Sequence, residues 1–276
     1  MAISAQEVNK LRQMTGAGMM DCKKALVEAD GDFDKAIEIL RKKGQKVSEK
    51  RADRETSEGG VFIKTSDDGK LATLIALGCE TDFVAKNDGF QELGNEILEV
   101  AFSHKPSDIE SLKSLKIGDL TINEKIVDMV GKIGEKIEIV AYELVEGEKV
   151  IPYIHSNSKL GVLVALSNTN GSDVEDAGKD VAMQIAAMNP VALDKDGVDS
   201  TIIERELEIG RDQARQEGKP ENIIDKIAEG KLNKFFKDNT LLQQAFVKDN
   251  SLTVAKYLDS VKSGLTVSQF KRISIG

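Results

Sequence analysis

Apolar residues recur along the chain at two spacings, which predict helices in some segments and strands in others. In the first 45 residues they return every three or four positions, as in Val8, Leu11 and Met14, which predicts three short helices. From about residue 59 they alternate with polar residues or form short runs bounded by polar turns, which predicts strands. Later segments return to helical spacing. The pattern therefore favours the α+β class of fold.

The amino-terminal segment carries the signals of a small helical bundle. Ser4 and Glu7 have the spacing of a capping box, and Gly16 predicts where the first helix ends, because glycine accepts left-handed backbone. We expect a second helix soon after that glycine and a third after the turn at Asp30. Three helices in so short a segment make a compact bundle that resembles the ubiquitin-associated type of domain. We assign residues 1–55 to it.

Two features of this segment have more than one interpretation. Met19 and Met20 are neighbours on the second helix, so they point about 100° apart, and a bundle of this size buries one easily and both only with difficulty. They are either core residues or an adaptable thioether surface for a partner protein. Residues 41–54 hold seven basic and two acidic residues without an aromatic one, which favours a solvated connecting segment over a nucleic-acid-binding arm.

Two segments far apart in the chain each predict a β-hairpin. Residues 59–65 and 70–80 are apolar runs around an Asp-Gly turn, and residues 149–167 repeat the order of strand, polar turn and strand. Aligning residues 69–78 with residues 158–167 matches five of the ten positions. We interpret this match as an internal duplication with an offset of 89 residues.

Each duplicated hairpin continues into a helix and then into a returning strand. The returning strands are predicted at residues 136–139 and 272–275. Each unit is therefore expected to be a three-stranded antiparallel sheet with helices on one face. We assign the first unit to residues 56–147, and the second to residues 148–198 and 237–276.

The second unit is interrupted by an insertion at residues 199–236. Two stretches with apolar residues at helical spacing flank Gly218 and Pro220, which predicts an antiparallel helical hairpin, a short coiled coil. Its other faces are mostly charged, so we expect it to project from the core. It is either a solvated spacer or an arm for contact or dimerisation.

The duplicated units differ at the corner between the second strand and the following helix. The second unit has a polar loop at residues 168–173, whereas the first reads Thr81 to Val84, with Asp82 and Phe83 between them. An aromatic side chain beside a carboxylate is unusual in such a corner. Phe83 is either part of the core or an outward anchor that fits a pocket of a partner.

Composition narrows the function classes. The 276 residues include 38 Lys and Arg against 47 Asp and Glu, a net charge of −9, which argues against general nucleic-acid or anionic-membrane binding. No apolar run approaches the length of a membrane span and the amino terminus lacks a secretory leader, so we expect a cytoplasmic protein. Aromatic residues are scarce, with 9 Phe, 3 Tyr and no Trp, so an exposed one is informative.

Motifs for cofactor binding or covalent chemistry are missing from the sequence. Neither GxxxxGK[ST] nor GxGxxG occurs, and the two cysteines lie far apart, outside any CxxC pair. His104, at a predicted helix end, has a structural explanation. His155 lies at the turn of the second hairpin, where it could face the same side as the corner at Thr81. We expect a partner-binding protein without a cofactor rather than an enzyme.

Several segments resemble bacterial translation elongation factor Ts. They are LRQMTGAGMMDCKKAL at residues 11–26, TDFVAKN at residues 81–87, the hairpin YIHSNSKLGVLVA, and the pair AMQIAAMNP and KIAEGKLNKFF. They occur in the family's order and span essentially the whole chain. The resemblance implies a guanine nucleotide exchange factor for the GTPase elongation factor Tu, which delivers aminoacyl-tRNA to the ribosome. It implies binding to the GDP-bound and nucleotide-free partner, without direct binding to nucleic acid or membrane.

The resemblance also implies roles for individual residues. The segment from Thr81 to Val84 dislocates Mg²⁺ from the partner, and Asp82 and Phe83 wedge between helices of its nucleotide-binding domain. Further partner contacts are implied for Leu11, Met19, Met20 and His155. An alternative from another class is an interaction module that binds proteins through its amino-terminal bundle.

Overall fold

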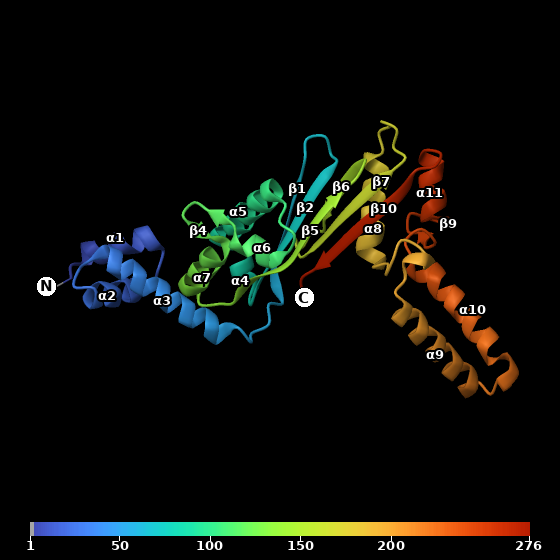
Figure 1. The fold of residues 1–276 in the computed structure, drawn as a ribbon, viewed down its shortest axis with the longest axis horizontal. Helices are drawn as coiled ribbons and strands as arrows, with labels where there is room; N and C mark the ends of the chain where they lie inside the picture. Colours follow the sequence, from blue (N-terminus) through green and yellow to red (C-terminus); the bar gives the residue numbers. More distant parts are fainter. Residues whose placement is uncertain (1–2) are drawn as a thin grey trace.

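The computed structural model describes residues 3–276, which form an elongated molecule (Figure 1). Three helices lie at the amino-terminal end, two sheets with their covering helices follow, and a pair of long helices lies at the opposite end. The carboxyl terminus returns to the middle of the molecule, where Gly276 lies close to Ser57. Helices combined with small antiparallel sheets confirm the predicted α+β class.

The helices at the amino-terminal end enclose a small apolar core of their own. The predicted capping box of Ser4 and Glu7 is present, and Gly16 ends the first helix in left-handed backbone with a φ of 67°. The three predicted helices are confirmed as α1 (Ala5–Thr15), α2 (Met19–Glu28) and α3 (Phe33–Arg51).

Helix α3 is longer than predicted. It runs through most of residues 41–54, which we had expected to be a solvated connection. The second half of α3 packs against helix α7 (Ile122–Ile133), and Val47 contacts the core of the first sheet. The helix persists there because tertiary packing, more than local propensity, stabilises helices in proteins.

Two three-stranded antiparallel sheets form the centre of the molecule, and both predicted hairpins are present. In each sheet the second strand of the hairpin lies in the middle and the returning strand pairs with it. The first sheet contains β1 (Glu58–Thr65), β2 (Leu71–Cys79) and β5 (Ile137–Glu146). The second contains β6 (Lys149–Ile154), β7 (Leu160–Ser167) and β10 (Thr266–Ser274).

The two sheets share a β-bulge at corresponding positions. In the first, the pairing of β2 with β5 shifts between Ala76 and Leu77, which leaves Val140 as the extra residue. In the second, the pairing of β7 with β10 shifts between Ala165 and Leu166, and the extra residue is Ser268. The two shifts lie 89 residues apart, as the sequence repeat does, which supports the predicted duplication.

The sheets pack face to face, and helices cover their outer faces. Alternate residues of β2 point to opposite sides, so that Leu74 faces the second sheet and Ile75 faces the helices. Both faces of β2 and β7 are covered, which explains their nearly continuous apolar sequences. The outer helices are α5 (Asp88–His104) and α7 on the first sheet, and α8 (Glu175–Met188) and α11 (Val254–Val261) on the second.

The insertion contains two helices that pack along each other, as Figure 1 shows at the end opposite the amino terminus. They are α9 (Ser200–Gln216) and α10 (Glu221–Asn239). Gly210 of α9 lies against Ala228 of α10, and Arg211 pairs with Asp225 at 2.7 Å. The two helices are therefore antiparallel.

Several short elements were not predicted from the sequence. All of those named here lie between the helix and the returning strand of a unit. They are α6 (Ile109–Ser114), β3 (Lys116–Ile117), β4 (Leu120–Thr121), α7, the 3₁₀ turn η1 (Lys195–Gly197), β8 (Ala245–Phe246), β9 (Asp249–Thr253) and α11.

Candidate functional site

A four-residue helix, α4 (Asp82–Ala85), follows strand β2 at the corner of the first unit. Thr81 begins it, and its side-chain Oγ1 accepts a hydrogen bond from the Val84 N–H at 3.4 Å. Val84 and the next residue are buried in the core under the first sheet. Because neighbouring helix residues point about 100° apart, this burial turns Phe83 outward, and 83% of Phe83 is exposed.

The exposure of Phe83 decides between the two interpretations of the corner. Phe83 has the largest exposed fraction among the large apolar side chains of residues 3–276, so the interpretation as a core residue is wrong. Beside it, Asp82 accepts a hydrogen bond from Lys86 Nζ at 2.7 Å. This bond lowers the pKa of Asp82, so its carboxylate stays charged near neutral pH. The corner therefore presents an apolar ring beside a negative charge.

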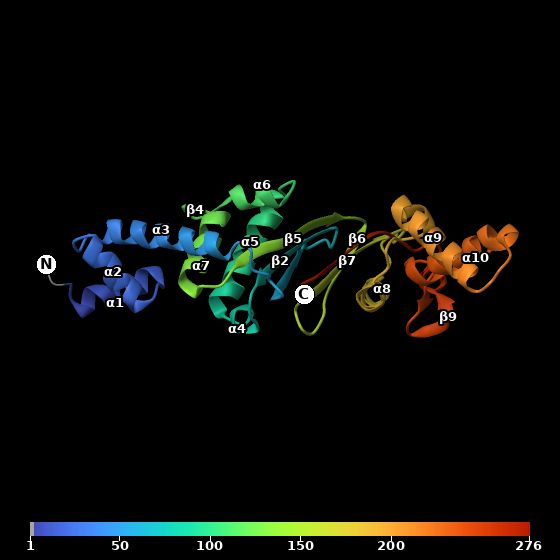
Figure 2. The ribbon, with the colours of Figure 1, turned by 90° about the horizontal axis from the view of Figure 1, so that it is seen from below.

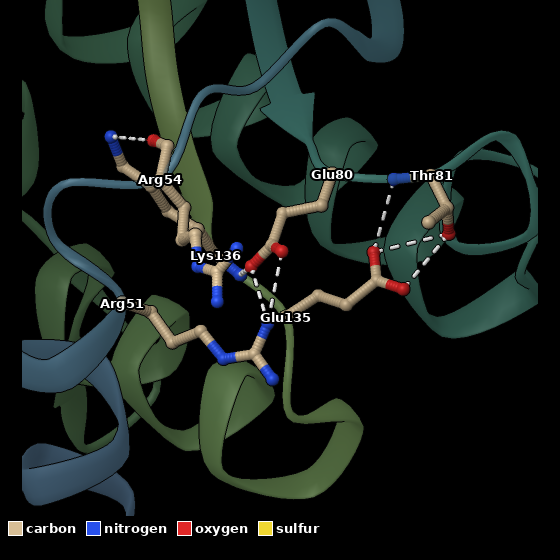
Figure 3. Close-up of polar contacts among 6 residues, drawn as sticks. All are labelled: Arg51, Arg54, Glu80, Thr81, Glu135 and Lys136. Atoms are coloured by element: carbon tan, nitrogen blue, oxygen red, sulfur yellow. Dashed lines mark hydrogen bonds and ion pairs between the residues drawn. The ribbon is translucent and has the colours of Figure 1, made fainter.

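The corner is tied to the loop that precedes β5 by a carboxylate clasp, formed by residues 80–81 and 135–136 (Figure 3). The Thr81 N–H and Oγ1–H both donate to the Glu135 carboxylate, at 3.1 and 2.9 Å. In return, the Lys136 N–H donates to Glu80 Oε1 at 2.7 Å. Each pair of residues thus offers one carboxylate and one backbone donor to the other.

Arg51, in the last turn of α3, contacts the same clasp. Its Nη1 lies 2.9 Å from both carboxylate oxygens of Glu80. Burial acts to raise the pKa of Glu80, but the Lys136 N–H and the Arg51 guanidinium outweigh it and hold that pKa below its ordinary value. Helix α3 is therefore fixed at this corner.

Cys79, the last residue of β2, is buried directly before the corner. Its Sγ lies 3.2 Å from the Thr81 carbonyl oxygen. Burial, together with the nearby negative charge of Glu135, raises the pKa of the thiol to about 12. Cys79 therefore remains protonated at neutral pH and packs as a small apolar residue of the core.

The amino-terminal helices expose both methionines that we had singled out. Met19 is 53% exposed and Met20 is 62% exposed, so neither is a core residue of the bundle. Leu11, by contrast, is fully buried among the three helices. In the free chain this side chain lies beneath the surface and supports it, and its implied partner contact stays a prediction.

His155 is exposed in the turn between β6 and β7, where its Nδ1 lies 2.9 Å from the Tyr153 hydroxyl. The turn is tied to the beginning of β1, since the Val61 N–H donates to the Ser158 carbonyl at 2.8 Å. Helix α4 also contacts β1. Figure 2 shows α4 and the β6–β7 turn on the same side of the molecule, so the structure places Phe83 and His155 on elements that share one neighbour.

The residues that hold the corner were not predicted from the sequence. Glu80, Glu135 and Arg51 were not singled out, although the predicted return of the chain at residues 136–139 puts Glu135 beside the end of β2. A charged residue directly before the Thr81 cap was the available signal. The expectation of a solvated segment at residues 41–54 concealed the role of Arg51.

Two classes of site find no support in residues 3–276. The structure there contains no cluster of three or more His, Cys, Asp or Glu residues arranged to hold a metal ion. Within the same residues, none of the helices has the length and apolar character needed to cross a lipid bilayer.

Comparisons with known proteins agree with the motifs at this corner. A family model described as Elongation factor TS matches residues 80–276. Elongation factor Ts of Amoebophilus asiaticus is 59% identical over 276 residues, which is 100% of both chains. Elongation factor Ts of Cytophaga hutchinsonii is 60% identical over 274 residues, and that of Christiangramia forsetii is 53% identical over 274 residues, with 99% of each chain covered. The chain therefore belongs to the elongation factor Ts family.

Proposed function

We propose that this chain accelerates GDP release from elongation factor Tu by inserting Phe83 into the partner's nucleotide-binding domain. Its family makes it a guanine nucleotide exchange factor for elongation factor Tu in translation, without covalent chemistry of its own. The observation that carries the finer mechanism is the exposed ring of Phe83 on an anchored corner. Burying such a side chain in a partner is worth about 1.5–3 kcal/mol.

The proposed mechanism acts through the partner's metal ion. In a P-loop GTPase, Mg²⁺ bridges the bound phosphates and is held by side chains on mobile segments. A ring wedged among those segments moves them, dislocates the ion and leaves the phosphate charge less well neutralised, so GDP departs faster. The factor then binds nucleotide-free partner more tightly than the GDP form, and by linkage nucleotide weakens the factor by the same ratio. GTP replaces GDP by mass action.

The other residues of the motif have supporting roles. Thr81 begins α4 and Val84 anchors it in the core, which leaves Asp82 and Phe83 facing the partner. Asp82, held charged by Lys86, accepts hydrogen bonds from groups freed in the displaced partner helices.

Two further surfaces contact the same partner in this proposal. The exposed side chains of Met19 and Met20 form an adaptable apolar surface that docks on the GTPase domain. His155 supplies a second contact from the β6–β7 turn, which lies on the same side of the molecule as helix α4. Contacts at several points hold the wedge in place while nucleotide leaves.

The proposed domain organisation follows the same family pattern. Residues 1–55 form a ubiquitin-associated-like module, residues 56–147 form the first core subdomain, and residues 199–236 form a coiled coil. Residues 148–198 and 237–276 form the second core subdomain. The buried small residues between α9 and α10 support the coiled coil, and the separate core of α1 to α3 supports the module.

The partner and the compartment follow from the reaction. The chain binds elongation factor Tu in its GDP-bound and nucleotide-free states, in the cytoplasm, where translation occurs. Its net charge of −9 disfavours direct contact with nucleic acid or with an anionic membrane.

A second candidate function is a protein-interaction module that acts through the amino-terminal helices alone. The observation that favours it is a group of exposed apolar residues on α1 and α2: Met14, Met19, Met20 and Val27. Deleting the bundle is a poor test, because Arg51 of α3 holds the corner at Glu80. Replacing Met19 and Met20 by Ser separates the hypotheses. This change abolishes partner binding if the bundle acts alone, and only weakens it if the core also binds.

The test of the proposed function is the release of a fluorescent GDP from elongation factor Tu. Catalytic amounts of the chain accelerate release, whereas the Phe83→Ala variant loses most of the acceleration. The Phe83→Leu variant keeps part of the apolar volume and therefore retains an intermediate rate. If Phe83→Ala releases GDP as fast as the unchanged chain, Phe83 is not the wedge.

A further inference from the structure

The hydrogen bonds within the corner that carries Phe83 are too few to fix its conformation. Helix α4 has four residues, and so short a helix does not form in isolation, because ordering the first turn costs more than one hydrogen bond returns. Val84 anchors one side of α4 in the core. The direction of the helix at its start is decided at Thr81, where the carboxylate clasp acts.

Glu135 orients the cap of this helix as well as its backbone. The Thr81 hydroxyl donates a hydrogen bond to the Glu135 carboxylate, which leaves an oxygen lone pair to accept the Val84 N–H. The same carboxylate accepts the Thr81 N–H. Removing Glu135 frees the hydroxyl to rotate and leaves the N–H without its acceptor, so both constraints on the start of α4 are lost together.

Glu80 carries the other half of the clasp and connects it to α3. Its side chain is 17% exposed and that of Arg51 is 36% exposed, so the pair is shielded from water more than an ordinary surface ion pair. Arg51 contacts both oxygens, and the Lys136 N–H contacts one of them. The helix that leads to the methionine surface and the corner that carries Phe83 thus share one carboxylate.

The second unit provides an internal comparison. There the Thr169 N–H and Oγ1–H donate to Glu148 Oε2 at 2.9 and 3.1 Å, in the same manner as Thr81 and Glu135. The residue before Thr169 is Asn168, a neutral amide in left-handed backbone whose side chain donates to the Gly264 carbonyl. A threonine held by a glutamate thus follows the middle strand in both units, although Thr169 lies one position before the match of Thr81 in the 89-residue repeat and Glu148 precedes β6 rather than the returning strand. A charged Glu80 paired with an arginine occurs in the unit that presents the aromatic ring.

We propose that Glu135 and Glu80 are positioning residues for nucleotide exchange, which hold the Phe83 ring in its outward direction before the partner is met. This inference rests on the proposed function of Phe83. A ring on a mobile corner would yield when it met the partner's helices. Part of the binding free energy would then be spent on ordering the corner instead of on moving the partner's segments. A ring on a clasped corner transmits the force of binding to the partner's segments. The clasp therefore acts on the maximal rate of GDP release more than on affinity.

The experiment compares Glu135→Ala, Glu135→Gln and, as a matched control, Glu92→Ala, which removes an exposed glutamate from α5. GDP release from elongation factor Tu is measured against factor concentration, which separates the maximal rate from half-saturation. We expect Glu135→Ala to lower the maximal rate by about tenfold or more, the factor expected for a lost hydrogen bond to a charged group. Half-saturation changes less. Glu135→Gln keeps an acceptor and restores most of the rate, and Glu92→Ala has no effect.

A second readout reports on the corner without the partner. The chain contains no tryptophan, so a Phe83→Trp variant carries a single fluorescent reporter at the tip of the corner. We expect the fluorescence anisotropy of this reporter in the free chain to fall when Glu135→Ala is added, and to stay unchanged with Glu92→Ala. Arg51→Gln loosens the Glu80 half alone, and we expect it to lower anisotropy and maximal rate in the same direction. It serves as the test if Glu135→Ala does not fold.

The outcomes separate this inference from the proposed function. If Phe83→Ala slows GDP release but Glu135→Ala and Arg51→Gln do not, the positioning role is overturned and the wedge stands. Equal losses in Glu135→Ala and Glu135→Gln with unchanged anisotropy also overturn it, because they indicate a lost charge rather than a lost orientation. If Phe83→Ala is fully active, the proposed function itself fails.

Discussion

Gly44 of α3 and Gly131 of α7 meet backbone against backbone where the two helices cross. A Cβ atom added to Gly131 would lie 2.8 Å from the Gly44 Cα, closer than side chains approach in folded proteins. This contact joins the amino-terminal helices to the first unit, alongside the bond between Arg51 and Glu80. Glycine is required at the crossing because only it allows this approach.

Two glycine-to-alanine changes inside helices are expected to have opposite effects on stability, one at this crossing and one on an open helix face. Gly131→Ala forces the helices apart, and we expect it to lower the free energy of unfolding by about 1–3 kcal/mol. Gly230, in α10, has no atom within 4 Å of an added Cβ. Gly230→Ala gains up to about 1 kcal/mol from helix propensity. Urea denaturation of both variants checks the prediction, which fails if Gly131→Ala is also stabilised.

Alanine variants of Leu11 and Met20 distinguish a core position from a surface position in the amino-terminal helices. Leu11→Ala leaves a cavity in a fully buried position, and we expect it to cost about 2–5 kcal/mol of stability in that bundle. Met20→Ala changes an exposed side chain and shifts stability by at most about 0.5 kcal/mol. Thermal unfolding followed by circular dichroism measures both. Equal destabilisation would contradict the assignment of Leu11 to the core and Met20 to the surface.

Alanine variants of Phe83 and Phe90 distinguish an exposed ring at the corner from a buried ring in the core of the first unit. Phe90 is fully buried, so Phe90→Ala is expected to lower the free energy of unfolding by about 3–5 kcal/mol. Phe83→Ala is expected to change it by no more than about 0.5 kcal/mol, because the ring is exposed. Urea midpoints of the two variants test this. A large loss of stability in Phe83→Ala would mean that its effect on GDP release cannot be assigned to a lost contact.

Stability is expected to fall at alkaline pH because two weak acids, the buried Cys79 and the partly buried Tyr257, keep their protons in the folded chain. The pKa of Cys79 is raised from 9.0 to about 12 by burial and by the charge of Glu135. The pKa of Tyr257 is raised from 10.0 to about 12 by burial and by its hydrogen bond to Asp180. The unfolded chain releases these protons at lower pH than the folded chain does. Their contribution is thus complete below about pH 9 and is lost progressively toward about pH 12.

Urea midpoints measured between about pH 8 and pH 11 test this expectation. The Cys79→Ala variant removes one of the two acids, so its stability should fall less steeply above about pH 9 than that of the unchanged chain. Identical slopes for the two chains would show that Cys79 ionises as readily in the folded state as in the unfolded state.

Local signals in the sequence were sufficient for much of the fold. The capping box at Ser4 and Glu7, the stop at Gly16 and the Asp-Gly turn before Lys70 each depend on residues close together in the chain. The repeat at an offset of 89 residues predicted two like units, and the corresponding β-bulges agree with it. The departure of the corner at Phe83 from its duplicate also drew attention to the candidate site.

The types of the main elements, the duplication and the motif from Thr81 to Val84 could be predicted from the residues alone, because periodicity, caps and turns are properties of neighbouring residues. The outward direction of Phe83, the burial of Leu11 and the extension of α3 to Arg51 became apparent from the folded chain. Those outcomes depend on which surfaces meet across long stretches of chain. The clasp joins residues more than fifty positions apart, and the packing of α3 on α7 determines where Arg51 reaches it.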